Sequence, residues 1–108
     1  MASNPDFVKY VEEQIADAGE ILSKKMFGEY GLYCNGKFFG LICDDKFFVK
    51  PTEPGREYIG QPVEAPPYDG AKNSFLIEAQ LDNREWVAEL VRITTAALPE
   101  PKPKKKKK

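Results

Sequence analysis

The chain has 108 residues, 42% of them hydrophobic and 12% aromatic, so it fits one folded domain and is not disordered throughout. Its net charge of −1 hides an asymmetry, because six of the 16 basic residues lie in the last ten positions and the remainder is acidic. An acidic body argues against a duplex-DNA footprint on the main surface. The sequence has no histidine, which removes the commonest general base and metal ligand.

An amphipathic helix is predicted near the amino terminus. Asn4 followed by Pro5 is typical of an N-cap with proline at the first helical position. Apolar residues then recur every four positions, at Phe7, Val11 and Ile15. The segment is charged throughout and lacks the apolar core of a signal peptide, and no apolar run approaches the ~18 residues of a membrane span. We therefore expect a cytoplasmic protein with no membrane partner.

Three antiparallel strands are predicted at about residues 22–34, 37–43 and 46–50. Asn35-Gly36 between two aromatic runs is a strong signal for a two-residue hairpin turn. The dipeptide at 44–45, Asp-Asp, is a weaker turn signal. A strict two-residue turn pairs residues whose numbers sum to 71.

This register predicts two apolar faces. The first carries Tyr30, Leu32, Cys34, Phe39, Leu41, Cys43, Lys46, Phe48 and Lys50. The second carries Phe27, Gly31, Tyr33, Phe38, Gly40, Ile42, Phe47 and Val49. We expect the helices to pack on the second face, where two opposed glycines allow close approach. Glu29 argues against this choice because it shares that face, unless a bulge at Gly28 moves it.

The first face would then be partly open and would mark a partner-binding surface. The alternative is that both faces are core and that lysine stems snorkel at the edges.

The second half of the chain predicts a short helix at 52–60, a loop at 61–73 with little room for a strand, and a strand at 74–79. A long helix follows, with Asp82 as N-cap and Trp86 packed against Leu81 in a hydrophobic staple beneath the sheet.

The fold class expected is α+β, with two layers: an antiparallel sheet packed against helices in the order α-β-β-β-α-β(β)-α. The domain is predicted to span residues 1–98. Residues 99–108, rich in Pro and Lys, are predicted to form a disordered tail.

The segment KMFGEYGLY at residues 25–33 resembles the M-F-G-x-Y-G-L-Y hallmark of the TfoX N-terminal domain. The segments at 66–72 and 84–86 are also similar to that family, and the resemblance covers about residues 5–98. It implies an α+β two-layer domain and regulation, which the competence regulator carries out in concert with a cyclic-AMP receptor protein. That regulator has two domains, whereas this sequence resembles the first alone. The family supplies no catalytic residues, so we expect no enzyme.

No cofactor or metal site is predicted. Cys34 and Cys43 lack C-x-x-C spacing and lie about 20 Å apart in the predicted register, so we expect two free thiols. Gly28 and Gly31 lie inside a strand rather than before a helix, which excludes a phosphate-binding loop.

The function expected is that of a small regulatory or adaptor domain, related to transcription or competence, that acts by protein–protein contact. Its partner is an unidentified protein or a second copy of the chain in a homodimer. The candidate binding residues are Tyr30, Phe39, Phe48 and Lys50 on the first face and Tyr68 in the long loop. Tyr68 could equally pin its loop to the core.

The alternative is a nucleic-acid-associated protein that uses the aromatic and lysine side chains of the sheet. The tail residues Lys104, Lys105, Lys106, Lys107 and Lys108 would add weak, non-specific phosphate contacts. The tail could instead steer the acidic body or keep the protein soluble. An enzyme is a third class, which the residues do not support.

Overall fold

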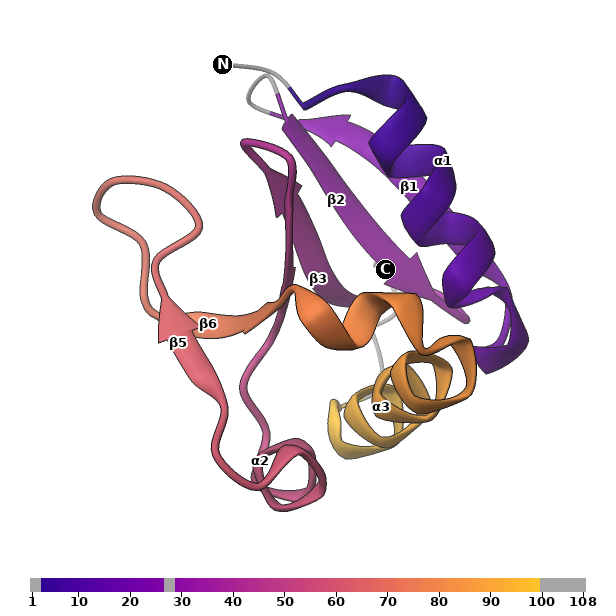
Figure 1. Ribbon diagram of the computed structural model, residues 1–108, viewed down its shortest axis with the longest axis vertical. Coiled ribbons are helices and arrows are strands. Elements are labelled where there is room, and N and C mark those ends of the chain that lie inside the picture. Colours follow the sequence, from indigo (N-terminus) through magenta and orange to yellow (C-terminus); the bar gives the residue numbers. More distant parts are fainter. Residues whose placement is uncertain (1–2, 27–28, 100–108) are drawn as a thin grey trace, which may run out of the picture.

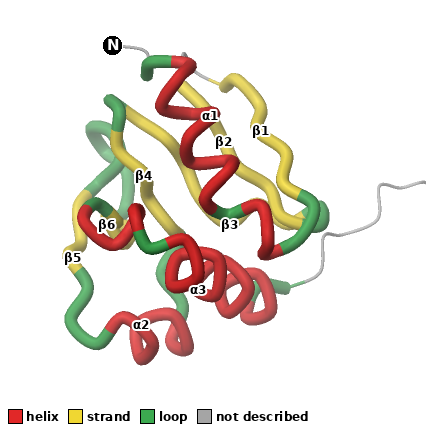
Figure 2. The backbone as a smooth tube through the Cα atoms, turned by 45° about the vertical axis from the view of Figure 1, so that its right-hand side comes forward, coloured by secondary structure: helices red, strands yellow, loops and turns green. Residues whose placement is uncertain are grey.

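The computed structural model describes residues 3–26 and 29–99. Six strands form one antiparallel sheet in the order β1-β2-β3-β4-β6-β5, and α1 and α3 lie against the same face of it (Figure 1, Figure 2). The strands are β1 (Ile21–Met26), β2 (Glu29–Cys34), β3 (Lys37–Cys43), β4 (Lys46–Val49), β5 (Val63–Ala65) and β6 (Ser74–Ile77). The helices are α1 (Pro5–Gln14), α2 (Glu53–Ile59) and α3 (Arg84–Ala97), with short 3-10 turns η1 (Ala16–Ala18) and η2 (Ala79–Asp82). The predicted two-layer α+β class is confirmed.

Helix α1 forms as its sequence predicts. The Asn4 side chain accepts a hydrogen bond from the amide of Asp6 at 2.8 Å, which satisfies one of the free N–H groups of the first turn. Val11 and Ile15 are fully buried against the sheet. Beyond η1, Gly19 has a φ of 155°, a conformation open to glycine, and leads the chain into β1.

The first predicted strand is wrong in one respect, because residues 22–34 form two strands and not one. β1 and β2 pair as an antiparallel hairpin, with Leu22 opposite Tyr33 and Lys24 opposite Gly31. Residues 27–28 connect them and lie outside the described residues, as does the suggested bulge at Gly28.

The predicted register of the next hairpin holds for two pairs and then fails. Cys34 pairs with Lys37 and Tyr33 with Phe38, as a two-residue turn requires. Leu32 then pairs with Gly40, because Phe39 is an extra residue that bulges out of the ladder. Since side chains alternate along a strand, this one-residue shift exchanges the faces of β2 and of the start of β3.

The sheet therefore has a covered face and an open face. The covered face lies under α1 and α3 and consists of Tyr30, Leu32, Cys34, Phe39, Ile42, Phe47, Val49, Phe75 and Ile77. The open face carries Leu22, Lys24, Gly31, Tyr33, Phe38, Leu41, Phe48, Lys50, Leu76 and Val63. The predicted faces are correct for β4 and for the end of β3, and wrong for β2, Phe38 and Phe39.

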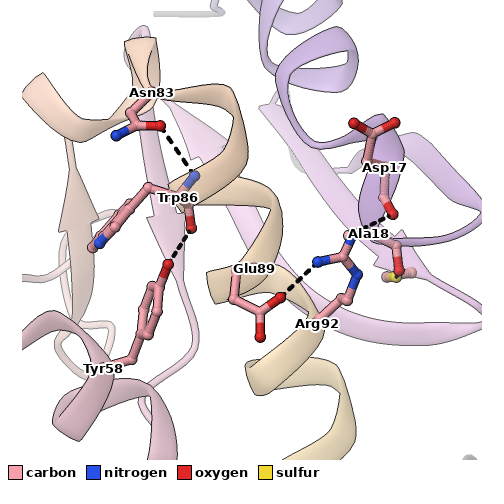
Figure 3. Close-up of polar contacts among 8 residues, drawn as sticks. Asp17, Ala18, Tyr58, Asn83, Trp86, Glu89 and Arg92 are labelled. Carbon is pink, nitrogen blue, oxygen red and sulfur yellow. Dashed lines mark hydrogen bonds and ion pairs between the residues drawn. The ribbon is translucent and has the colours of Figure 1, made fainter.

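Helix α3 starts one residue later than predicted. Asn83, and not Asp82, is its N-cap, and the Asn83 side chain accepts from the amide of Trp86 at 3.2 Å (Figure 3). The Asp82 carboxylate instead accepts a hydrogen bond from the Tyr10 hydroxyl of α1. Trp86 is half-buried as predicted and packs against the core, and it also stacks on Tyr58 of α2 with ring centroids 5.2 Å apart, so it joins two helices.

A short strand, β5, occupies the region predicted to be loop. It pairs with β6 and is the outer strand on that side of the sheet. Arg56 of α2 forms an ion pair with Glu64 at 2.9 Å and lies over the Phe75 ring at 5.2 Å, which ties β5 to the helix before it. Three residues between prolines are sufficient for a strand because β6 supplies the hydrogen-bonding partner.

Candidate functional site

The open face is the surface of the domain that offers exposed apolar side chains next to cations. Leu22 and Val63 lie at its two outer strands and are 52% and 62% exposed. Between them, Tyr33, Phe38, Leu41 and Leu76 are half-buried. Contiguous exposed apolar surfaces are typical of interaction sites in general, so this face is the candidate site.

A pair of aromatic rings forms the centre of one corner of this face. Tyr33 and Phe38 are directly opposite one another on β2 and β3, with ring centroids 5.3 Å apart and planes inclined by 44°. The Lys24 ammonium lies 5.6 Å from the Tyr33 ring centroid, and the Lys50 ammonium lies 5.0 Å from that of Phe38. Each cation is within the range of a cation–π interaction. We call these four residues the ring corner.

The ring corner borders a shallow depression that reaches the end of α3. Tyr33, Phe38 and Lys50 line it together with Leu98 and Pro99. The carboxyl-terminal end of the last helix therefore lies next to the ring corner, and the lysine-rich segment follows Pro99 in the sequence.

Lys37 fixes this arrangement. It projects from β3 on the covered side, and its ammonium donates hydrogen bonds of 3.1 Å to the carbonyl oxygens of Thr95 and Leu98. These carbonyls belong to the last turn of α3, where a helix has no partners of its own for its C=O groups and a cation is favoured by the helix dipole. The hairpin that carries Tyr33 and Phe38 is thereby joined to the end of α3.

The other half of the open face has an apolar centre on β3, β4, β6 and β5. Phe48 of β4 has Leu41 opposite it on one side and Leu76 on the other, and Leu76 pairs in turn with Val63. Phe48 is only 3% exposed, so Leu41, Leu76 and Val63 form the accessible surface. We call these three residues the aliphatic stripe.

The opposite end of β2 is polar, and its polar groups form hydrogen bonds with neighbouring residues of the domain. The Glu29 carboxylate accepts hydrogen bonds from the Ser3 amide and hydroxyl at 2.9 and 2.7 Å, and from the Asp44 amide at 2.9 Å. Ser3 is consequently buried. Nearby, burial and the charges of Glu29 and Asp44 raise the pKa of the Cys43 thiol above its usual value, which makes this thiol a poor nucleophile at neutral pH.

The two cysteines are both free and lie on opposite faces of the sheet, contrary to the predicted register. Cys34 is fully buried on the covered face, with its sulfur 3.8 Å from the carbonyl oxygen of Ala18. Cys43 pairs with Lys46 on the side of the open face. No group of three or more His, Cys, Asp or Glu side chains within residues 3–26 and 29–99 is placed to hold a metal ion.

The structure brings two of the candidate binding residues to the open face and places two on the covered face. Phe48 and Lys50 lie on the open face, but Phe48 is buried there. Phe39 is fully buried and meets Phe47 edge to face, and Tyr30 packs partly buried against the same core, because the bulge turns both towards the helices. Tyr68 lies in the loop between β5 and β6 and is 60% exposed, so it does not pin that loop to the core. Lys104, Lys105, Lys106, Lys107 and Lys108 lie outside the described residues.

The register predicted from the sequence places Tyr33 and Phe38 on the covered face, whereas the structure places them on the surface. Glu29 is the signal that could have found them, since it shares a side of β2 with Gly31 and Tyr33. A carboxylate that shares a face with apolar residues is costly to bury beneath helices. The position of Glu29 therefore favours the open face for Tyr33 and its partner Phe38.

Within the part of the chain that the structure describes, no helix combines the length and the apolar character that crossing a membrane requires.

Comparison with known proteins finds two matches. Residues 13–98 match the TfoX N-terminal domain. The chain is also 36% identical over 107 residues to the "Uncharacterized 12.7 kDa protein in trpE 5'region" of Spirochaeta aurantia, and the alignment covers 99% of this chain and 93% of that protein. The segment that matches the TfoX N-terminal domain includes all six strands and therefore the entire open face.

Proposed function

Because the chain belongs to the TfoX N-terminal domain family, which is regulatory and non-enzymatic, we propose that it is a small regulatory or adaptor domain that binds a protein partner. The partner docks on the aliphatic stripe of the open face. Regulation of transcription or competence is the process in which such an adaptor would work.

The exposure of Val63 is the observation that carries this proposal. A valine at 62% exposure, continuous with Leu76 and Leu41, gives an apolar centre without a charged side chain. Protein interfaces have centres of this kind, depleted of charge and enclosed by polar residues. The covered face cannot serve, since α1 and α3 already occupy it.

The edge of the stripe supplies polar contacts around this centre. Lys46 is exposed at the start of β4 and pairs with Cys43 on the side of the open face. Tyr68 follows β5 and is exposed in the adjoining loop. Aromatic side chains on loops are frequent anchors of protein contacts, so Tyr68 is included in the proposed interface.

The test is a nuclease-treated pull-down from cells with the full-length chain and matched charge variants. Val63→Glu places a carboxylate in the stripe, and Ala16→Glu places one on exposed η1, away from the open face. We expect the same partner with the native chain and with Ala16→Glu, and at least tenfold less with Val63→Glu, because a buried unpaired charge opposes association. Equal recovery with both variants would refute the docking surface.

A full-length variant with Lys104–Lys108 replaced by glutamine separates this contact from the tail. Nuclease treatment removes proteins that are recovered through bound nucleic acid. A partner that disappears with the glutamine tail while Val63→Glu retains it would show that the tail, and not the stripe, makes the contact.

A further inference from the structure

We infer that the ring corner is a binding site for single-stranded nucleic acid, distinct from the aliphatic stripe and independent of the protein contact. The site consists of Tyr33 and Phe38 as a stacking surface for bases and of Lys24 and Lys50 as partners for the connecting phosphates.

The rings satisfy the requirement for stacking. They lie side by side on neighbouring strands with centroids 5.3 Å apart, and none of the helices within residues 3–26 and 29–99 covers their side of the sheet. Gly31, which precedes Tyr33 on the same face, carries no side chain that would obstruct a flat base. Bases of any identity stack on such rings, so the surface tolerates sequence variation.

The two lysines satisfy the requirement for charge. Their ammonium groups lie over the rings at 5.6 and 5.0 Å, one on each side of the pair. Because lysine stems are flexible, each ammonium can leave its ring for an adjacent phosphate as a base takes its place. Each ring of the corner thus has one lysine ammonium within reach of its face.

The positions of the other charged side chains on the open face also favour phosphate binding at the ring corner. Glu29 is the one carboxylate among the described strand residues of the open face, and it lies at the other end of β2, where Ser3 and Asp44 satisfy it. Lys46 is at that end as well and lies 3.9 Å from the Asp44 carboxylate. Lys24 and Lys50 remain at the ring corner, so an approaching phosphate chain meets cations there first.

The carboxyl-terminal end of α3 lies next to the ring corner. Leu98 and Pro99 border the same depression as Tyr33, Phe38 and Lys50, and six lysines follow within the next nine residues. Lys37 holds the end of α3 at this position. Pro99 therefore lies beside the stacking surface, and the lysines that follow it in the sequence can add a sequence-independent attraction for a polyanion.

A single strand fits this corner better than a duplex or an acidic peptide. The bases of a duplex are stacked on each other and cannot reach the rings, and the acidic body would repel the second strand. An acidic peptide would use the lysines but leave two aromatic rings without a matching planar partner. Rings paired with lysines are the combination that unpaired nucleotides recognise.

The experiment measures binding of a fluorescein-labelled oligothymidylate of about 12 nucleotides by anisotropy, between about 50 and 500 mM salt. Full-length chains are compared: the native protein, Tyr33→Ala, Phe38→Ala, Phe38→Leu, and a variant with Lys104–Lys108 replaced by glutamine. Tyr68→Ala is the matched control, an exposed aromatic residue outside the ring corner. Far-UV circular dichroism and urea midpoints verify that each variant is folded, and Phe38→Leu keeps apolar bulk at that position.

We expect two separable parts of the affinity. The glutamine tail should lower the slope of log K against log salt by about 0.7 for each phosphate that the tail no longer neutralises, and should leave a salt-resistant remainder. Tyr33→Ala, Phe38→Ala and Phe38→Leu should each weaken that remainder by roughly 5- to 150-fold, the value of one stacked base. Tyr68→Ala and Val63→Glu should bind as the native chain does, whether or not Val63→Glu still recovers its protein partner.

Four results would overturn the site. These are no binding of the oligothymidylate by the native chain, loss of all binding with the glutamine tail, equal affinity of folded ring variants and native chain at high salt, and binding of a duplex of the same length as tightly as the single strand.

Discussion

Both faces of the sheet carry aromatic and aliphatic residues, but one face packs against helices and the other is open. Phe38 and Phe39 are neighbours in the sequence, yet Phe39 is fully buried beneath the helices and Phe38 lies half-exposed beside a lysine. Aromatic content alone therefore does not distinguish core from binding surface. What distinguishes them is whether a helix lies against the face, and in this domain a single bulged residue determines which side chains meet the helices.

The largest effect should come from truncating the same side chain on each face. Phe39→Ala removes a fully buried ring that packs on Phe47, and should lower the free energy of unfolding by about 3–5 kcal/mol. Phe38→Ala removes a ring that is already partly in water, and should cost about 1 kcal/mol or less. Urea unfolding measures both. Similar losses for the two variants would mean that the faces are not divided as described.

The close approach of β3 and β4 can be tested at Gly40. A Cβ at this position would lie 2.4 Å from the carbonyl oxygen of Phe48, a backbone atom on β4 that cannot turn aside. Gly40→Ala should therefore push β3 and β4 apart and cost about 1–3 kcal/mol in urea unfolding. A neutral effect would show that the two strands can separate at this point without loss of stability.

The connection between the hairpin and α3 should have an intermediate effect. Lys37→Met keeps the aliphatic stem but removes the donor to Thr95 and Leu98, and should cost about 1–2 kcal/mol. Lys50→Met is the matched control on the open face, and should change the free energy of unfolding by about 0.5 kcal/mol or less. Equal values for the two variants would remove Lys37 as the residue that holds the end of the helix.

The smallest effect is kinetic and concerns the thiols on the two faces. In single-cysteine variants, the folded protein should react with a disulfide reagent about tenfold or more slowly than the urea-unfolded protein. Cys43 should react faster than Cys34, because it is slightly exposed. The rate at Cys43 should still be rising above pH 9, since its pKa is raised by burial and by the charges of Glu29 and Asp44. A rate that levels off near neutral pH would contradict this environment.

Much of the fold can be predicted because its signals are local. The Asn4 cap, the turn at residues 35–36, the short helix capped by Thr52 and the long apolar stripe of α3 all depend on residues within a few positions of one another. The strand β5 escapes prediction because it has only three residues, between Pro62 and Pro66, and no tight-turn signal joins it to β6. The N-cap of α3 is misplaced at Asp82 because consecutive polar residues offer equally good caps.

The candidate site can be predicted only in part, for a physical reason. Strands with apolar residues on both sides show no alternation of apolar and polar residues that would fix their register. The bulge at Phe39 therefore cannot be recognised from the sequence pattern. Lys50 is predicted on the correct face because it follows β4, beyond the bulge. Tyr33 and Phe38 are predicted on the wrong face because they lie before it. Glu29 alone indicates the error.

Nuclear magnetic resonance of the ¹⁵N-labelled full-length chain, titrated with the oligothymidylate at about 150 mM salt, tests the central claim most directly, because it shows which face the ligand meets. We expect the largest shifts for backbone amide signals of the strands around Lys24, Tyr33, Phe38 and Lys50. The amide signals of α1 should not shift. Shifts concentrated in α1 and the outer side of α3, or no shifts in the strands at saturation, would contradict the claim that the open face is the binding surface of this domain.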